Sequence, residues 1–272
     1  MPYQKILSVQ DISCVGQCSL TVALPILSAC GLETAILPSA VLSTHTCGFT
    51  GYTFRDLTED IPAIRTHWEK EGIRFAAIYT RYLGSTLQIS YVKDIFRSPV
   101  SGGLKIVDPA MADGGKLYPA FDMEFVHEMA GLCAEADIVI PNITEAAFLS
   151  GMDYRESYDE SYILELCKAL CAKGIKTVVL TGVGYRPGKT GVVVYESGDY
   201  SYYEHEKKTQ GCHGTGDVYA SAFVGKLMQG SSLFDAAKAA ADFTLRCIEL
   251  TAGDPNHRYG VKFELALPEL MK

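Results

Sequence analysis

Residues 211–223 of the chain read Gly211-Cys212-His213-Gly214-Thr215-Gly216-Asp217-Val218-Tyr219-Ala220-Ser221-Ala222-Phe223. A glycine-rich turn leads directly into small and apolar residues, a pattern that predicts the start of a helix. The first backbone N–H groups of a helix have no partner inside it, and they favour negative charge at that end. Gly214 and Gly216 leave room for a ligand, and glycine tolerates the positive φ that a tight turn needs. The segment therefore predicts an anion-binding turn.

Asp217 falls in the first turn of this predicted helix, beside the anion site. A carboxylate repels a phosphate, so it is poorly suited to bind one. It is well suited to act as a base that takes a proton from an alcohol attacking phosphorus. The residues alone leave a second interpretation open, an ordinary helix with Thr215 or Asp217 as its N-cap.

The composition limits the kind of protein this can be. The 272 residues are enough for one large α/β domain or two small ones, and an apolar fraction of 48% supports a sizeable core. The net charge of −8, with no basic cluster, argues against a nucleic-acid or membrane surface. We find no apolar run of about 20 residues that could cross a membrane, and no signal-peptide pattern at the start.

The cysteines and the missing motifs narrow the choice further. The nine cysteines are scattered without a Cys-x-x-Cys pair, which predicts reduced thiols in a cytoplasmic protein rather than disulfides or a zinc site. The chain has no Gly-x-x-x-x-Gly-Lys-Ser/Thr, so it is not a P-loop enzyme. The absence of Gly-x-Ser-x-Gly argues against the interpretation of the chain as a serine hydrolase.

Short apolar strands alternate with helical patterns along the whole chain. The predicted strands are 6–9, which ends at Asp11, then 34–42, 75–79, 104–107, 138–140 and 177–180. The predicted helices are 20–30, 61–71, 86–96, 121–135, 144–150, 162–173, 215–228 and 233–250, with a β-hairpin at 192–195 and 200–205. This alternation predicts an α/β fold with a mostly parallel central sheet and helices on both faces. No linker divides the chain, so we expect a single domain over residues 1–272.

Polar residues follow the predicted strands with some regularity. In such a sheet, ligands bind beyond the carboxyl ends of the strands. The residues expected at those ends are Asp11, Tyr82, Asp108, Asn142, Glu145, Thr181 and Gly182, and the Gly214 turn belongs with them. Each of them, taken singly, also fits an ordinary loop or helix cap.

Gly214-Thr215-Gly216-Asp217 resembles the anion-hole motif of the ribokinase superfamily, and further segments resemble its pyridoxal kinase branch. They occur in the family's order across nearly the whole chain. They are Ser43-Thr44-His45-Thr46, Tyr82-Leu83-Gly84-Ser85, Asp108-Pro109-Ala110-Met111-Ala112-Asp113-Gly114-Gly115-Lys116-Leu117-Tyr118 and Pro141-Asn142-Ile143-Thr144-Glu145. The resemblance implies a three-layer α/β/α kinase that transfers a phosphoryl group from ATP to the 5′-hydroxymethyl group of pyridoxal, pyridoxamine or pyridoxine.

The resemblance also implies a role for each matching position. Asp217 would be the catalytic base, and Gly214, Thr215 and Gly216 would bind the transferred phosphoryl group. Asp11, His45, Thr46 and Tyr82 would contact the substrate. Asn142, Glu145 and Asp108 would organise Mg²⁺. The nucleotide would be bound by Asp108, Asp113, Asn142, Thr181, Gly182 and Thr215. A monovalent cation such as K⁺ and a homodimer are further family expectations.

Two positions depart from the pyridoxal kinase pattern. Asp11 stands where these kinases usually have Ser, and an acidic residue there could pair with a pyridinium or with the amine of pyridoxamine. It is also similar to the Asp that hydroxymethylpyrimidine kinases use to hold substrate. Arg81 replaces a Gly; its guanidinium either lies at the rim of the pocket or points to solvent, and we favour solvent.

Two other functions stay open on the sequence. One is a hydroxymethylpyrimidine kinase or other small-alcohol kinase of the same superfamily, which Asp11 favours and the His-Thr loop disfavours. The other is a non-catalytic ligand-binding protein on this fold, which the intact base, anion turn and metal motif disfavour.

Overall fold

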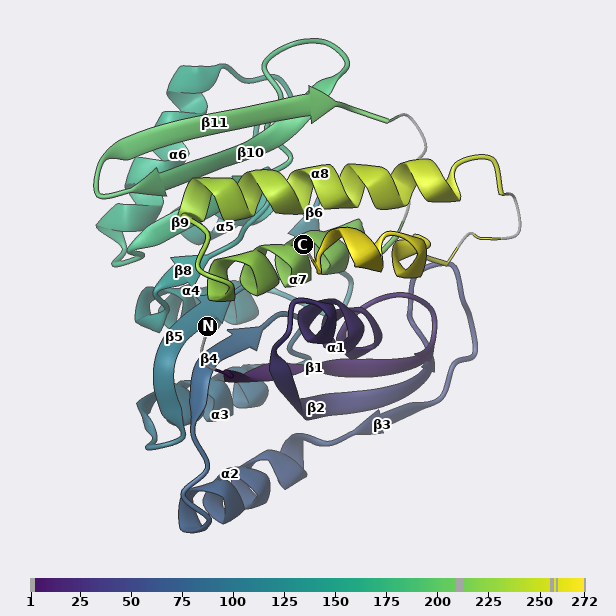
Figure 1. Cartoon of the computed structure of the whole chain (residues 1–272). Coiled ribbons are helices and arrows are strands. Elements are labelled where there is room, and N and C mark those ends of the chain that lie inside the picture. The colour runs from purple at the N-terminus through teal and green to yellow at the C-terminus, as the bar shows by residue number, and fades with distance from the viewer. Residues whose placement is uncertain (1–2, 209–212, 255–256, 258, 272) are drawn as a thin grey trace. The chain divides into compact units, whose positions relative to one another are not determined.

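The computed structural model describes residues 3–208, 213–254, 257 and 259–271 (Figure 1). By its internal contacts the chain divides into two compact units, Met1–Ile61 with Lys207–Lys272, and Pro62–Glu206. We describe each unit by itself, and the single domain over 1–272 stays a prediction. No helix in the described ranges is both long and apolar enough to span a bilayer.

The first unit combines the two ends of the chain. Its strands are β1 (Lys5–Val15), β2 (Glu33–Thr44) and β3 (Phe54–Asp56), and its helices are α1 (Leu20–Ala29), α7 (Thr215–Met228) and α8 (Leu233–Thr251). Short 3₁₀ turns span Thr58–Asp60, Phe263–Leu265 and Leu267–Glu269. β1 pairs in parallel with β2, which pairs antiparallel with β3. α7 packs against both α1 and α8, so it forms the centre of the helical part of this unit.

β1 is longer than the sequence pattern predicts. The apolar run ends at Val9, but the ladder with β2 continues to the pair Val15 and Thr44. The register shifts between Gln10 and Ile12, which places Asp11 at a bulge inside the strand. The prediction that the strand ends at Asp11 was therefore wrong, because backbone pairing continued where the apolar pattern stopped.

The second unit holds most of the parallel sheet. Its strand order is β4 (Phe75–Thr80), β5 (Ser101–Val107), β8 (Ile138–Val139), β9 (Thr177–Thr181), β10 (Lys189–Glu196), β11 (Asp199–Glu206). β4, β5, β8 and β9 run parallel, while β10 and β11 form the predicted hairpin. A small hairpin joins β6 (Ala112–Asp113) and β7 (Lys116–Leu117). The helices are α2 (Ile61–Lys70), α3 (Thr86–Arg97), α4 (Met123–Glu135), α5 (Ile143–Ser150) and α6 (Glu160–Ala172).

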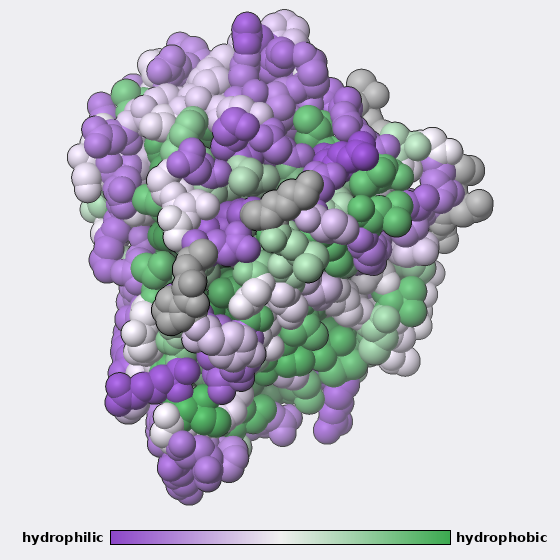
Figure 2. All heavy atoms as spheres, viewed as in Figure 1, coloured by the Kyte–Doolittle hydropathy of each residue, from purple (hydrophilic) through white to green (hydrophobic). Residues whose placement is uncertain are grey.

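These elements confirm the predicted α/β class, the mostly parallel sheet and the hairpin near 192–205. The parallel strands are short apolar runs because both their faces are covered: Val178, Val179 and Leu180 of β9 are fully buried. β11 forms the end of the sheet and alternates polar with aromatic residues. The surface over β10 and β11 is accordingly hydrophilic (Figure 2), as suits an edge strand that must not pair with another chain.

A bulge in β5 depends on a pair of glycines. The pairing of Phe75 with Ser101 is followed by that of Ala77 with Leu104, so Gly102 and Gly103 together face Ala76. A Cβ on Gly103 would lie 1.9 Å from the Ala76 carbonyl oxygen, whereas one on Gly102 would lie 3.1 Å from the Phe75 oxygen. Gly103 therefore allows the close approach of β4 and β5.

We expect Gly103→Ala to lower the free energy of unfolding by about 1–3 kcal/mol, because the new methyl group must displace the neighbouring backbone. Urea unfolding of the purified protein measures this change. Gly102→Ala is the matched control and should cost clearly less. Equal costs for the two variants would contradict this account of the bulge.

Candidate functional site

The turn before α7 has the geometry that its glycines suggest. Gly214 is the N-cap of α7 and adopts a left-handed conformation, with φ +77°. A Cβ at Gly214 would lie 2.1 Å from the carbonyl oxygen of Gln17. Both the backbone angle and this contact exclude a side chain there. Thr215, Gly216 and Asp217 then form the first turn of α7, where N–H groups lack partners inside the helix. Gly211 and Cys212 of the motif lie outside the described residues.

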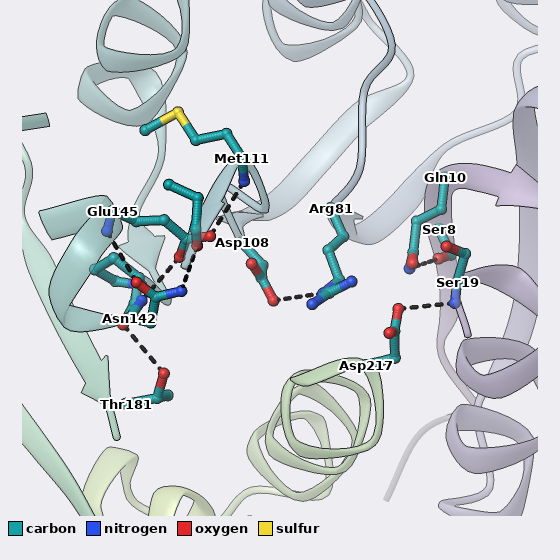
Figure 3. A network of polar contacts seen from close by, with 12 residues as sticks. Ser8, Gln10, Ser19, Arg81, Asp108, Met111, Asn142, Glu145, Thr181 and Asp217 are labelled. Carbon is teal, nitrogen blue, oxygen red and sulfur yellow. Dashed lines mark hydrogen bonds and ion pairs between the residues drawn. The ribbon is translucent and has the colours of Figure 1, made fainter. Parts of the chain in front are cut away.

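Asp217 is buried, with 3% of its surface exposed. Its Oδ1 accepts a hydrogen bond from the backbone N–H of Ser19 at 2.7 Å (Figure 3). Ser19 lies directly before α1 and forms an isolated antiparallel bridge with Ile12 of β1. The carboxylate is therefore held by backbone from a distant part of the sequence.

Asp11 lies close to this base. It is 5% exposed, and its Oδ2 accepts a hydrogen bond from the Ser13 hydroxyl at 3.2 Å. Burial raises the pKa of Asp11, and the charge of Asp217 raises it further, while hydrogen bonds from Ser19 and Ser13 lower it. The first unit thus contains a pair of interacting carboxyl groups.

His45 is held by its backbone neighbours. Its Nε2 lies 3.0 Å from the carbonyl oxygen of Tyr259, and its Nδ1 accepts a hydrogen bond from the Cys47 N–H at 3.1 Å. A carbonyl can only accept, so Nε2 carries the hydrogen. Both ring nitrogens are thus engaged, and His45 offers a ligand its ring rather than a hydrogen bond. Thr46 follows it in an exposed loop.

In the second unit, the start of α5 binds the loop after β5. Asn142 and Glu145 form a capping box: the Asn142 Oδ1 accepts from the Glu145 N–H at 2.9 Å, and Glu145 Oε2 accepts from the Asn142 N–H at 2.8 Å. The Asn142 side-chain amide also donates to the Ala112 carbonyl, and the Met111 N–H donates to Glu145 Oε1 (Figure 3). Asn142 and Glu145, two of the three predicted metal residues, therefore already hold the backbone of the Asp108–Asp113 segment.

Glu145 has a strongly perturbed acidity. Burial raises the pKa of Glu145 to about 8, the charge of Asp108 adds to this, and the bonds from Asn142 and Met111 with the charge of Arg81 oppose it. Burial and the neighbouring Asp108 therefore favour the protonated form of the carboxyl, while its two backbone donors favour the ionised form. A cation near it would favour the ionised form.

Arg81 does not point to solvent, the alternative that we favoured from the sequence. Its Nε donates to Asp108 Oδ2 at 2.8 Å, and the two side chains are 17% and 8% exposed. The buried carboxylate of Asp108 needs a counter-charge, which a surface arginine could not supply as well. No local pattern in the sequence showed this pairing, because the two residues lie 27 positions apart. Arg81 follows the end of β4, and Asp108 follows the end of β5.

The remaining predicted residues of the second unit also lie near the ends of its strands. Tyr82 follows β4, with its ring 5.6 Å from that of Phe121. Asp113 is exposed and accepts from the Gly114 N–H. Thr181 ends β9, and both its N–H and its hydroxyl donate to the Pro141 carbonyl. Gly182 follows with φ +78°.

The predicted residues thus fall into two groups. The first unit brings together Asp11, His45, Gly214, Thr215, Gly216 and Asp217, with Thr46 beside them. The second holds Tyr82, Asp108, Asp113, Asn142, Glu145, Thr181 and Gly182. Sequence reasoning missed Ser19, whose positive φ has no signature in the sequence. Among the described residues, no three His, Cys, Asp or Glu side chains are arranged to hold a metal ion.

Known proteins match this chain over most of its length. A candidate phosphomethylpyrimidine kinase from Bacteroides thetaiotaomicron, solved with pyridoxal, is 38% identical, with a TM-score of 0.92 over 99% of this chain and 96% of that chain. Pyridoxal kinase from Lactobacillus plantarum is 29% identical, with a TM-score of 0.91 over 98% and 96%. The pyridoxine kinase of Bacillus subtilis is 31% identical over 149 residues, which cover 53% of this chain and 53% of that protein.

The resemblance to pyridoxal kinases is confirmed by these matches, as is the predicted fold. The sequence model of the family described as phosphomethylpyrimidine kinase matches residues 29–261. Because this match spans well over half of the sequence, the chain belongs to the phosphomethylpyrimidine kinase family.

Proposed function

We propose that this kinase transfers a phosphoryl group from ATP to the 5′-hydroxymethyl group of a vitamin B6 compound, pyridoxal, pyridoxamine or pyridoxine. The observation that carries the proposal is the buried Asp217 carboxylate in the first turn of α7, directly after the left-handed Gly214. The pyridoxal in the Bacteroides structure and the pyridoxal kinase of Lactobacillus plantarum support this choice of substrate.

The chemistry assigns one task to each group of the turn. The Asp217 carboxylate takes the proton of the substrate hydroxyl. The hydroxyl oxygen forms a bond to the γ-phosphorus, and the bond from that phosphorus to ADP breaks. The N–H groups of Gly214, Thr215 and Gly216 stabilise the negative charge on the transferred phosphoryl oxygens. His45, Thr46 and Tyr82 are the residues that we propose contact the substrate ring.

The nucleotide is assigned to Asp108, Asp113, Asn142, Thr181, Gly182 and Thr215. Magnesium, when bound with ATP, would neutralise phosphate charge. Asn142, Glu145 and Asp108 would hold it largely through water, which suits a donor set whose oxygens already accept hydrogen bonds. A homodimer, a cytoplasmic location and a role for K⁺ are proposed with this function.

Hydroxymethylpyrimidine is the second candidate substrate, because the family model is that of phosphomethylpyrimidine kinases. Coupled ADP release with pyridoxal, pyridoxamine, pyridoxine and hydroxymethylpyrimidine, side by side, separates the two. The proposal expects a B6 compound to give the highest kcat/KM. A preference for hydroxymethylpyrimidine would replace it, and silence with all four would favour a non-catalytic ligand-binding protein.

We expect Asp217→Asn to keep the fold and ATP binding but to lose roughly 10²–10⁴-fold in kcat, the usual cost of removing a general base. The Asn side-chain oxygen can still accept from Ser19, so the variant should unfold at a similar temperature. Asp235→Asn, the same change in the first turn of α8, is the matched control and should keep full turnover. Near-normal turnover of Asp217→Asn would remove this residue from the mechanism.

Glu145→Gln should raise the Mg²⁺ concentration needed for half-maximal rate, since one carboxylate fewer acts on a hard cation and its waters. A Mg²⁺ titration of the initial rate measures this. The control is Glu124→Gln, an exposed acidic residue in the first turn of α4. An unchanged titration in Glu145→Gln would show that this side chain serves the capping box alone.

The same variant tests the acidity of Glu145. Its pKa is raised in the folded protein, so its contribution to stability is complete below the unfolded pKa and is lost as pH rises through about 8. We expect the free energy of unfolding to fall between about pH 4.5 and pH 8 in the native chain, to level off above about pH 8, and to fall less in Glu145→Gln. Parallel pH curves from urea unfolding would contradict this assignment.

A further inference from the structure

Gln17 is in close contact with two segments that are far from it in the sequence. Its carbonyl oxygen is 2.1 Å from the place where a Cβ on Gly214 would lie, at the start of α7. Its own Cβ is 2.4 Å from the place of a Cβ on Gly260. Gly260 belongs to the C-terminal segment, by which we mean residues 257 and 259–264. The turn that starts α7 and the C-terminal segment therefore pack against the same residue.

The side chain of Gln17 is bound at both of its polar atoms. Its Nε2 donates to Glu264 Oε1 at 2.6 Å. A carboxylate can only accept, so the amide nitrogen faces Glu264 and the amide oxygen faces the other way. There Oε1 lies 2.7 Å from His257 Nε2, which donates to it. The C-terminal segment thus binds both groups of the Gln17 amide.

The backbone of Gln17 is attached to the same segment. The Tyr259 carbonyl accepts from the Gln17 N–H at 3.2 Å, and it also accepts from His45 Nε2 at 3.0 Å. The segment is itself held by α8, because the Lys262 N–H donates to the hydroxyl of Thr251 at 2.8 Å. Thr251 is fully buried at the end of α8. Gln17 is therefore connected to the helical core of the first unit.

This support lies two residues before the group that holds the proposed base. The Ser19 N–H donates to Asp217 Oδ1 at 2.7 Å (Figure 3). Ser19 has φ 53° and ψ −133°, a backbone conformation that residues other than glycine rarely adopt. Such a conformation persists only where the surroundings enforce it. The contacts of Gln17 fix the chain directly before Ser19, so they help to set the direction of its N–H.

We propose that Gln17 is a positioning residue for Asp217, and that the C-terminal segment acts through Gln17 to fix the loop whose Ser19 N–H holds the Asp217 carboxylate. This inference rests on the proposed role of Asp217 as the base. Sequence reasoning did not single out Gln17. Its side-chain partners lie 240 and 247 positions away, so no local pattern shows them.

Gln17→Met tests the amide. Methionine has a similar length and volume but neither of the two hydrogen-bonding groups. We expect a loss of roughly 10-fold in kcat with the KM for the substrate nearly unchanged, as for a displaced catalytic group. Gln229→Met is the matched control. Gln229 caps the other end of α7, and its amide donates to the carbonyls of Cys30 and Leu270, so this variant should lose stability but keep its kcat. A normal kcat in Gln17→Met would overturn the proposal.

Variants of Glu264 test whether the C-terminal segment acts through this bond. Glu264→Gln keeps an oxygen that accepts from the Gln17 amide and should retain most of the turnover. Glu264→Ala removes the acceptor and should lower kcat. Combining Glu264→Ala with Gln17→Met should cost no more than Gln17→Met alone, because both changes remove the same bond. Fully additive losses would overturn the proposed connection.

Gly260→Ala perturbs the same loop by contact instead of by a lost bond. The backbone of Gly260 lies outside the left-handed region, so the added methyl group acts only by pressing on Gln17. We expect kcat to fall and KM to stay nearly constant. Gly225→Ala is the matched control, since its Cβ would lie equally close, 2.4 Å, to the Cys30 Sγ inside the helical core. That variant should lower the unfolding temperature and leave kcat unchanged. Equal kcat losses in the two variants would contradict the proposal.

Amide hydrogen exchange of the native protein and of the Gln17→Met and Gly260→Ala variants decides the matter without any substrate. We expect the Ser19 N–H to exchange roughly 10-fold faster in both variants, because its bond to Asp217 opens more often. Amides in the middle of α8, such as that of Ala241, should keep their native rates. Unchanged exchange at Ser19 in both variants would overturn the positioning role. Faster exchange in a protein whose native form phosphorylates none of the four compounds would retain that role and count against the proposed substrates instead.

Discussion

The close contact between the Gly214 turn and the loop before α1 is the constraint on which the first unit depends. The Gln17 carbonyl lies where a Cβ of residue 214 would be, and the neighbouring Ser19 N–H binds Asp217. One short loop therefore sets both the entry into α7 and the position of its acidic side chain. Because α7 also packs on α1 and α8, the helix start cannot shift without disturbing the apolar core of the unit.

The second unit buries two acidic side chains, Asp108 and Glu145. Asp108 is paired with Arg81, while Glu145 accepts two backbone N–H groups and has a pKa raised to about 8 by burial. A guanidinium in one case, and two backbone donors with a raised pKa in the other, reduce the cost of burying these two acids. If ATP and its cation bind at these acids, as we propose, they meet side chains that are already fixed in place.

Much of the fold and most of the candidate residues could be predicted from the sequence because their signals are local. Strand β9 is an apolar run with a polar residue at its end, and Asn142 and Glu145 have the spacing of a capping box. Predictions failed where a distant partner decided the outcome. Strand β1 continues past Val9 because its backbone pairs with β2 as far as Val15. Arg81 is turned inward because it pairs with the buried carboxylate of Asp108. Neither partner is visible within the windows from which periodicity is judged.

The sequence by itself determined the element types, the glycine turn that starts α7 and the resemblance to a kinase family, since each depends on residues close together in the chain. Only the tertiary structure decided what holds those residues. It placed Asp11 in a bulge beside Asp217, gave Ser19 its unusual backbone angles and engaged both nitrogens of His45. The physical reason is that burial, strain and charge pairing arise from atoms brought together by folding, and no single segment carries them.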